Sequence, residues 1–356
     1  MMTADIYHGL PGDNGLDLRW FYGMNDFQQQ ETLRQAEYKR KNFPGLPDGV
    51  WSSRPTYHYP HILPEGHLEK NFYPPIYHPI VSYLEEGDIA GHTELLNLKS
   101  SQACCFNFLF HLRLTPDVAP NFLAAALPGV RQVSAIEFEY TGPDGTTEWL
   151  GEPPGGRRGQ NRTSMDAAIW WQDEKGKKRL TLIEWKYTEA EFGDCGGYKS
   201  HGNRQRSSCN NLVPSELQPE VDCYLATGLT KLTSRRYWEH LSMAGISPQS
   251  FSDEPGCPFK GPFYQLLRQF LIRAYCQEAM DDVDLVDNVV IGFRDNVHLL
   301  QTPSHLRRPS DTIIDTWNCL LTTAPPLRWV SVDELVTGIG NGSQDWRKYL
   351  GDRYGV

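Results

Sequence analysis

Two acidic residues and a lysine lie in two neighbouring segments whose polar and apolar residues alternate. Asp166 belongs to the segment 164–171, and Glu184 and Lys186 belong to the segment 179–187. Alternation of this kind is typical of β-strands, in which every second side chain points to the same face. Carboxylates and an ammonium group on adjacent strands can hold a divalent cation and a phosphate together, so these three residues are the leading candidates for a functional site.

The connection between the two segments decides whether these side chains meet. Residues 172–178 are polar turn formers, which predicts a β-hairpin. If the turn is centred on Lys175, Asp166 lies directly opposite Glu184, with their Cβ atoms about 4.5–5.5 Å apart. Glu184 and Lys186 then share one face of their strand. This prediction depends on the register, because a slip of one residue would turn Asp166 to the other face.

Two carboxylates facing each other repel, and a bound cation would remove the conflict. Mg²⁺ prefers oxygen ligands and is held by one or two carboxylates while it keeps waters and substrate phosphate. We therefore expect a Mg²⁺ site, with Mn²⁺ able to substitute, at Asp166 and Glu184. The alternative is an ordinary surface ion cluster across a hairpin, since exposed opposite charges often pair with little consequence.

The residues around these positions resemble the motif of the PD-(D/E)XK nucleases. The matching residues are Ser164-Met165-Asp166 and, after the hairpin turn, Ile183-Glu184-Trp185-Lys186, with Met165 in place of the proline. The resemblance implies that Asp166 and Glu184 bind the metal and that the backbone carbonyl of Trp185 adds a ligand. It also implies that Lys186 orients or activates the attacking water. The catalytic residues would then be Asp166, Glu184 and Lys186.

A wider match is more specific than the short motif. Five segments in order, within about residues 93–335, resemble a bacterial restriction endonuclease family; they are 100–107, 138–140, 163–168, 184–189 and 263–269. This resemblance implies an α/β fold with a restriction-endonuclease-like core, in which helices flank a central mixed sheet. It also implies endonucleolytic cleavage of DNA in defence against foreign DNA. The alternatives are a nuclease acting on RNA or on DNA ends, and a non-catalytic nucleic-acid-binding protein.

The remaining elements must position this hairpin. The pattern predicts strands at 133–140 and 289–293, and a short strand from 329 that passes into a helix begun at 333. It also predicts helices at 25–41, 93–127 and 262–280, and the helix at 93–127 has a break at Thr115-Pro116. Residues 1–90 are rich in aromatic residues and proline, and we expect an irregular extension packed on a nuclease domain at 91–356. Residues 192–218 form a polar insertion in that domain.

Further candidates surround the motif. Gln102 and Glu152 are possible accessory site residues, each weighed against a structural role, and Gln265 is a weaker candidate of the same kind. The net charge is −10, so DNA contacts must come from a local basic stretch rather than from the whole surface. The DNA-binding candidates are Arg157, Arg158, Arg162, Lys199, Arg204 and Arg206.

The eight cysteines contain no CxxC pair. A cysteine metal site is the alternative to free thiols, and the wide spacing of Cys195, Cys209, Cys223 and Cys257 favours free thiols. We find neither a signal peptide nor a long apolar run, which predicts a protein of the reducing cytoplasm with no membrane partner. A homodimer stays an open alternative.

Overall fold

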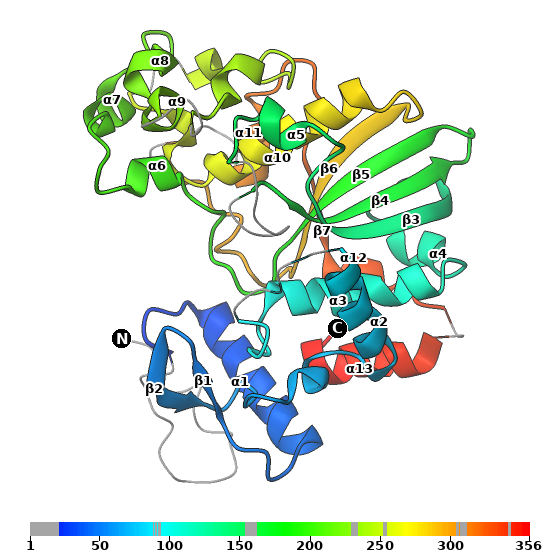
Figure 1. The fold of residues 1–356 in the computed structure, drawn as a ribbon. Helices are drawn as coiled ribbons and strands as arrows, with labels where there is room; N and C mark the ends of the chain where they lie inside the picture. Colours follow the sequence, from blue (N-terminus) through cyan, green and yellow to red (C-terminus); the bar gives the residue numbers. More distant parts are fainter. Residues whose placement is uncertain are drawn as a thin grey trace.

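A five-stranded mixed sheet forms the centre of the computed structural model (Figure 1). Its strands follow the chain order: β3 (Val130–Tyr140), β4 (Met165–Asp173), β5 (Lys178–Trp185), β6 (Leu285–Gly292) and β7 (Arg328–Ser331). The first three strands pair antiparallel, whereas β6 joins β5 and β7 joins β6 in parallel. The structure describes residues 21–87, 89, 91, 94–153, 162–228, 234–251, 255–303, 306, 312–340 and 343–356.

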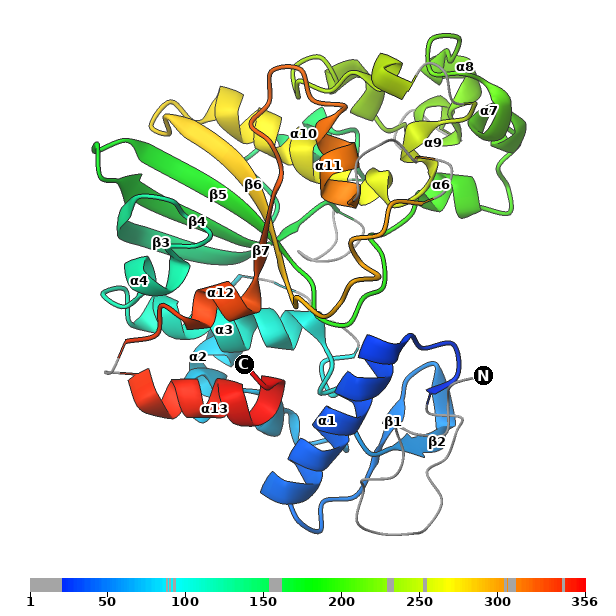
Figure 2. The same cartoon turned by 180° about the vertical axis from the view of Figure 1, so that it is seen from behind.

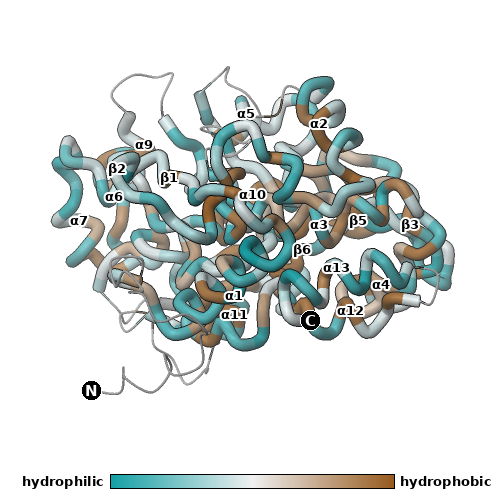
Figure 3. Tube along the Cα trace, turned by 90° about the horizontal axis from the view of Figure 1, so that it is seen from below, coloured by the Kyte–Doolittle hydropathy of each residue, from teal (hydrophilic) through white to brown (hydrophobic). Residues whose placement is uncertain are grey.

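Helices cover both faces of this sheet, which confirms the predicted α/β class (Figures 1 and 2). On one face lie α3 (Ser101–Leu114), α4 (Ala119–Leu123), α12 (Val332–Val336) and α13 (Gln344–Tyr354). On the other face lie α10 (Phe263–Ala279) and α11 (Ile313–Asn318), with the short α5 (Thr146–Trp149) nearby. Hydrophobic residues concentrate along α3, α10 and the strands between these helices (Figure 3).

Strand side chains alternate between two hydrophobic cores, one on each face. Ile183 and Trp185 of β5 join the core that contains α3, whereas Leu180 and Leu182 join the core that contains α10. This alternation follows from the strand period of two. It assigns Glu184, which follows Leu182 by two residues, to the α10 face.

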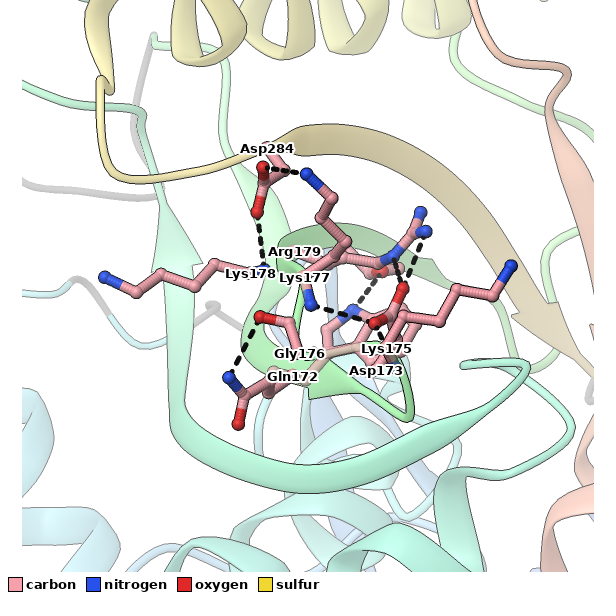
Figure 4. Close-up of polar contacts among 10 residues, drawn as sticks. Gln172, Asp173, Lys175, Gly176, Lys177, Lys178, Arg179 and Asp284 are labelled. Atoms are coloured by element: carbon pink, nitrogen blue, oxygen red, sulfur yellow. Dashed lines mark hydrogen bonds and ion pairs between the residues drawn. The ribbon is translucent and has the colours of Figure 1, made fainter.

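The hairpin register is the predicted one. Trp171 pairs with Arg179, and the pairing continues to Ala167 opposite Ile183, one step before Asp166 and Glu184. Figure 4 shows how the turn is held: one oxygen of Asp173 accepts hydrogen bonds from the backbone N–H groups of residues 175 and 177, both at 2.9 Å. Gly176 supplies the positive φ of 80° that this turn requires.

The predicted helices and their break are also present. The helix expected at 25–41 is α1 (Asp26–Asn42), and the one expected at 262–280 is α10. The segment 93–127 contains α3 and α4, separated at Thr115-Pro116 as expected, but the first helix begins at Ser101 rather than at 93. Proline explains the break, because it lacks the N–H that a helix interior needs.

The N-terminal portion is more regular than predicted. It contains the strands β1 (Gly49–Trp51) and β2 (Arg54–Tyr59), the helix α2 (Tyr77–Glu86), and the 3₁₀ turns η2 (Leu68–Asn71) and η3 (Pro74–Ile76). The expectation of an irregular segment was therefore wrong for α2. Pro79 lies in the first turn of α2, where a missing backbone N–H costs no helical hydrogen bond. Side chains of α1 and α2 join the α3-side core, so these two helices pack against the sheet. The division at residue 90 stays a prediction.

The bounds of the insertion predicted at 192–218 stay a prediction. The described residues between β5 and α10 form a helical excursion that lies beside α10, away from the sheet (Figure 1). It contains α6 (Gly196–Lys199), α7 (Arg206–Asn211), α8 (Pro219–Asp222), α9 (Tyr224–Thr227), η4 (Tyr237–His240), η5 (Pro248–Phe251) and η6 (Pro258–Lys260).

Candidate functional site

The three predicted catalytic residues meet where β5 ends and β4 begins. Glu184 and Lys186 are buried, with 5% and 6% of their surface exposed, whereas Asp166 is half-buried. The backbone N–H of Trp185 donates to Oδ2 of Asp166 at 2.6 Å, and Lys186 Nζ lies 2.8 Å from Oε1 of Glu184. These buried contacts differ from the exposed ion cluster that was the alternative interpretation.

Helix α10 brings two glutamines to the same carboxylate. Nε2 of Gln265 donates to Oε1 of Glu184 at 2.5 Å, and Nε2 of Gln269 donates to Oε2 of Glu184. Oε1 of Gln265 in turn accepts from Lys186 Nζ at 3.2 Å. Residues four apart lie on one face of a helix, so both amides point to the end of β5. Sequence reasoning placed Gln265 only as a weak candidate and missed Gln269, although this four-residue spacing could have indicated it.

Glu139, at the end of β3, is a third carboxylate of the site, itself buried, that sequence reasoning missed. Its Oε1 accepts from Nε2 of Gln102 at 2.6 Å, and its Oε2 accepts from Oγ of Ser164 at 3.0 Å. Among the residues that the structure describes, Glu139 alone combines a side chain with a positive φ, of 49°. Such a backbone costs energy and persists where the surroundings demand it, often at functional sites. Gln102, the predicted accessory residue, therefore reaches the site through Glu139.

The carboxylates and the lysine change one another's ionisation. Burial raises the pKa of Asp166 well above its usual range, and the negative charges of Glu184 and Glu139 raise it further. Burial alone would lower the pKa of Lys186, but the carboxylates of Glu184, Glu189 and Asp166 outweigh it and raise this pKa above its usual value. Lys186 is therefore a charged ammonium group at neutral pH, and its Nζ also lies over the Phe192 ring, 5.3 Å from the ring centre, a contact that favours the charged form.

The donor set is compatible with a magnesium ion. Asp166 and Glu184 are oxygen ligands of the kind that Mg²⁺ prefers, and a cation between them would relieve the repulsion that raises the pKa of Asp166. In the described part of the chain, no three His, Cys, Asp or Glu side chains are arranged to hold one ion. A Mg²⁺ site here would consist of two carboxylates completed by backbone, water or substrate oxygens, as is usual for this ion.

Glu152, the other accessory candidate, is engaged elsewhere. It is buried, and its carboxylate accepts from the backbone N–H of Thr163 at 2.8 Å, from the Thr163 hydroxyl and from the Tyr237 hydroxyl at 2.7 Å. Arg268 of α10 lies 3.6 Å from the same carboxylate. Glu152 thus ties the chain entering β4 to α10 and η4. A metal could take its oxygens only at the cost of these bonds.

The described DNA-binding candidates come from two parts of the fold. Lys199, Arg204 and Arg206 are exposed on the helical excursion, and Lys199 is already paired with Asp194 at 2.6 Å. Arg162 is half-buried ahead of β4, whereas Arg157 and Arg158 lie outside the described residues. Further lysines occupy the hairpin turn of Figure 4. The turn is separated from Trp185 by the length of β5, about 23 Å at about 3.3 Å per residue.

Comparison with known families adds an independent observation. Residues 26–355 match the family described as Restriction Endonuclease associating with ARP. The chain belongs to this family. Membership agrees with the restriction-endonuclease-like core described above and indicates a nuclease connected with restriction. No curated protein and no solved structure matches the chain. Within the described residues, no helix has the length and apolar character needed to cross a membrane.

Proposed function

We propose that this member of the restriction endonuclease family is a magnesium-dependent nuclease of the PD-(D/E)XK type, which hydrolyses phosphodiester bonds of DNA in defence. The observation that carries the proposal is the group formed by the half-buried Asp166 and the buried Glu184 and Lys186 on adjacent strands. Its residue types and its order along the chain agree with the motif found in the sequence. Family membership supports the same class of reaction.

Each residue has a role that follows from its surroundings. Asp166 and Glu184 would hold the ion, with the carbonyl of Trp185 as a further ligand. When bound, Mg²⁺ would stabilise the charge on the phosphoryl oxygens. Lys186 is held charged by its carboxylate neighbours, so it is a poor general base at neutral pH. It would instead hold the attacking water and stabilise the charge that develops on the phosphate.

Gln265 and Gln269 would act by positioning Glu184. Both oxygens of this carboxylate accept an amide hydrogen bond from α10. Hydrogen bonds of this kind orient a ligating carboxylate and limit its rotation. Glu139 would set the charge around Asp166, because its carboxylate raises the pKa of Asp166.

The test is a side-by-side cleavage assay on supercoiled plasmid, linear duplex DNA, single-stranded DNA and RNA, each with Mg²⁺ and with EDTA. We expect cleavage of circular duplex DNA that requires the metal and is lost in Asp166→Asn. Digestion from ends alone, or of RNA alone, would assign the same site to a different substrate. Metal-independent cleavage, or undiminished cleavage by Asp166→Asn, would contradict the proposal.

A further inference from the structure

Four cysteines that are far apart in the sequence line a single cavity beside α10. They are Cys195, Cys209, Cys223 and Cys257, and the cavity has a volume of about 30 Å³. None of them forms a disulfide. Their wide spacing favoured separate free thiols, so their assembly around one space is not what the sequence predicted.

Backbone hydrogen bonds hold the segments of Cys195, Cys209 and Cys257 together. The N–H of Cys257 donates to the carbonyl of Cys209 at 2.9 Å, and the N–H of Cys195 donates to the carbonyl of Lys260 at 3.3 Å. Cys209 belongs to α7, Cys223 directly precedes α9, and Cys257 directly precedes η6. Each cysteine is therefore fixed by a short helical element, and the helical excursion as a whole folds around the cavity.

The surroundings of the sulfur atoms suit thiolate ligands. The backbone N–H of Tyr198 points to Sγ of Cys195 at 3.4 Å, a contact that stabilises a negatively charged sulfur. Arg235 and Lys260 also line the cavity and supply positive charge. Cys209 and Cys257 are buried, and Cys195 and Cys223 are half-buried. Metal ligation removes thiol protons, so a bound centre would turn these four thiols into thiolate ligands.

The shape of the space distinguishes a cluster from a single ion. Four thiolates that bind one zinc ion converge to about 2.3 Å from its centre and leave no cavity between them. Here the cysteines surround a space that could hold about two waters, by the 10–15 Å³ that one water needs. Within the part of the chain that the structure describes, no three potential ligands are arranged for a single ion. Four cysteines that line one small cavity match a multi-atom centre ligated by cysteine.

We propose that Cys195, Cys209, Cys223 and Cys257 are the four ligands of an iron–sulfur cluster. On assembly each thiol gives up its proton and forms one bond to iron, and Arg235 and Lys260 offset part of the resulting negative charge. The cluster lies in the helical excursion and has no residue in common with the group around Asp166, so this proposal does not depend on the proposed nuclease function.

The place of the cluster in the fold indicates a structural task. Tyr264 and Leu267 of α10 line the same cavity, while Gln265 of that helix bonds Glu184. Gln265 also accepts from the backbone N–H of Gly193, at 2.7 Å, two residues before Cys195. The cluster would therefore fasten the excursion to α10 and keep the amide of Gln265 in place.

The full chain should be expressed with iron and cysteine supplied and purified without oxygen, then assayed for iron, acid-labile sulfide and zinc. We expect iron and sulfide in equal amounts and a broad visible absorption that dithionite bleaches. Serine at any one of the four cysteines should remove most of the iron and the colour. Cys276→Ser, buried outside the cavity, and the exposed Cys319→Ser should keep both.

Since a ligand variant can also fail to fold, the wild-type protein provides the decisive measurement. A chain with zinc in place of iron, or with no metal after anaerobic reconstitution with ferrous iron and sulfide, would overturn the proposal. Retention of full iron by all four serine variants would overturn the ligand assignment as well.

Discussion

Magnesium should stabilise the folded protein through Asp166, and Asp166→Asn should abolish that effect. A ligand that binds only the folded state at about 100 times its Kd adds about 2.7 kcal/mol to the free energy of unfolding. With an unfolding entropy of roughly 2.1 cal/mol/K per residue over 356 residues, this corresponds to a rise in Tm of about 3–4 °C. Asparagine keeps the shape and still accepts the N–H of Trp185, so loss of this rise would report the missing charge.

The pH dependence supplies a second readout with a defined sign. The folded-state pKa of Asp166 is raised above the unfolded value of about 3.9. Its contribution to the stability of the metal-free protein is therefore fully present below pH ~3.9 and is lost as pH rises through the folded pKa. Because Mg²⁺ competes with the proton, the Mg²⁺-induced rise in Tm should grow over the same interval. At pH values above this interval, the Tm of the metal-free Asp166→Asn variant should equal or exceed that of the metal-free wild-type protein.

The assay is thermal unfolding with and without Mg²⁺ at a series of pH values. Asp284→Asn is the matched control, because Asp284 bonds the backbone and side chain of the hairpin at the opposite end of β5 (Figure 4). This control should change the Tm by itself and leave the Mg²⁺-induced rise intact. If Asp166→Asn keeps that rise, or if the rise does not depend on pH, Asp166 is not a ligand.

Three further tests follow, two on neighbours of Asp166 and one on the helical excursion. Lys186→Ala should lower turnover by about 100- to 1,000-fold in single-turnover cleavage, while a Mg²⁺ titration should show unchanged or tighter metal affinity. A large loss of metal affinity would mean that the lysine has a structural role. Glu139→Gln should move the pH midpoint of Mg²⁺ binding downward, because its charge raises the pKa of Asp166, and an unmoved midpoint would remove Glu139 from the site. Charge reversal at Arg204 and Arg206 should reduce the salt slope of DNA binding by about 2, whereas reversal at Lys177 should not; equal slopes would mean that the excursion does not contact DNA.

The hairpin shows what the sequence could predict. Alternation located β4 and β5, and the turn residues centred them on Lys175, so the side-by-side placement of Asp166 and Glu184 followed from local rules. Sequence could not predict what α10 adds, because the partner of Glu184 is more than eighty residues away along the chain. Glu139 was missed for a related reason, since its role depends on a backbone conformation that its residue type does not favour.

The spacing of the four cysteines along the sequence could not predict that they line one cavity. Compact metal motifs place ligands a few residues apart because one turn must present them together. Cys195, Cys209, Cys223 and Cys257 are instead presented by separate short helices, so their spacing carries no signature. Only the path of the helical excursion, which returns to α10 through η6, brings them to one cavity.

The first turns of helix α10 contact both proposed centres, the magnesium site and the iron–sulfur cluster. Its glutamines must stay rigid, because each donates to one oxygen of Glu184, while the neighbouring Tyr264 and Leu267 border the cysteine cavity. Adjacent helical positions point in different directions, so one helix can contact both centres without bringing them together. Loss of the cluster would then loosen Gln265 first and Gln269 less, since only Gln265 is also bonded to the excursion, at Gly193. Cluster-free protein should accordingly bind Mg²⁺ through Asp166 and Glu184 yet turn over more slowly, whereas Gln265→Ala in the loaded protein should reproduce that slower turnover without loss of iron.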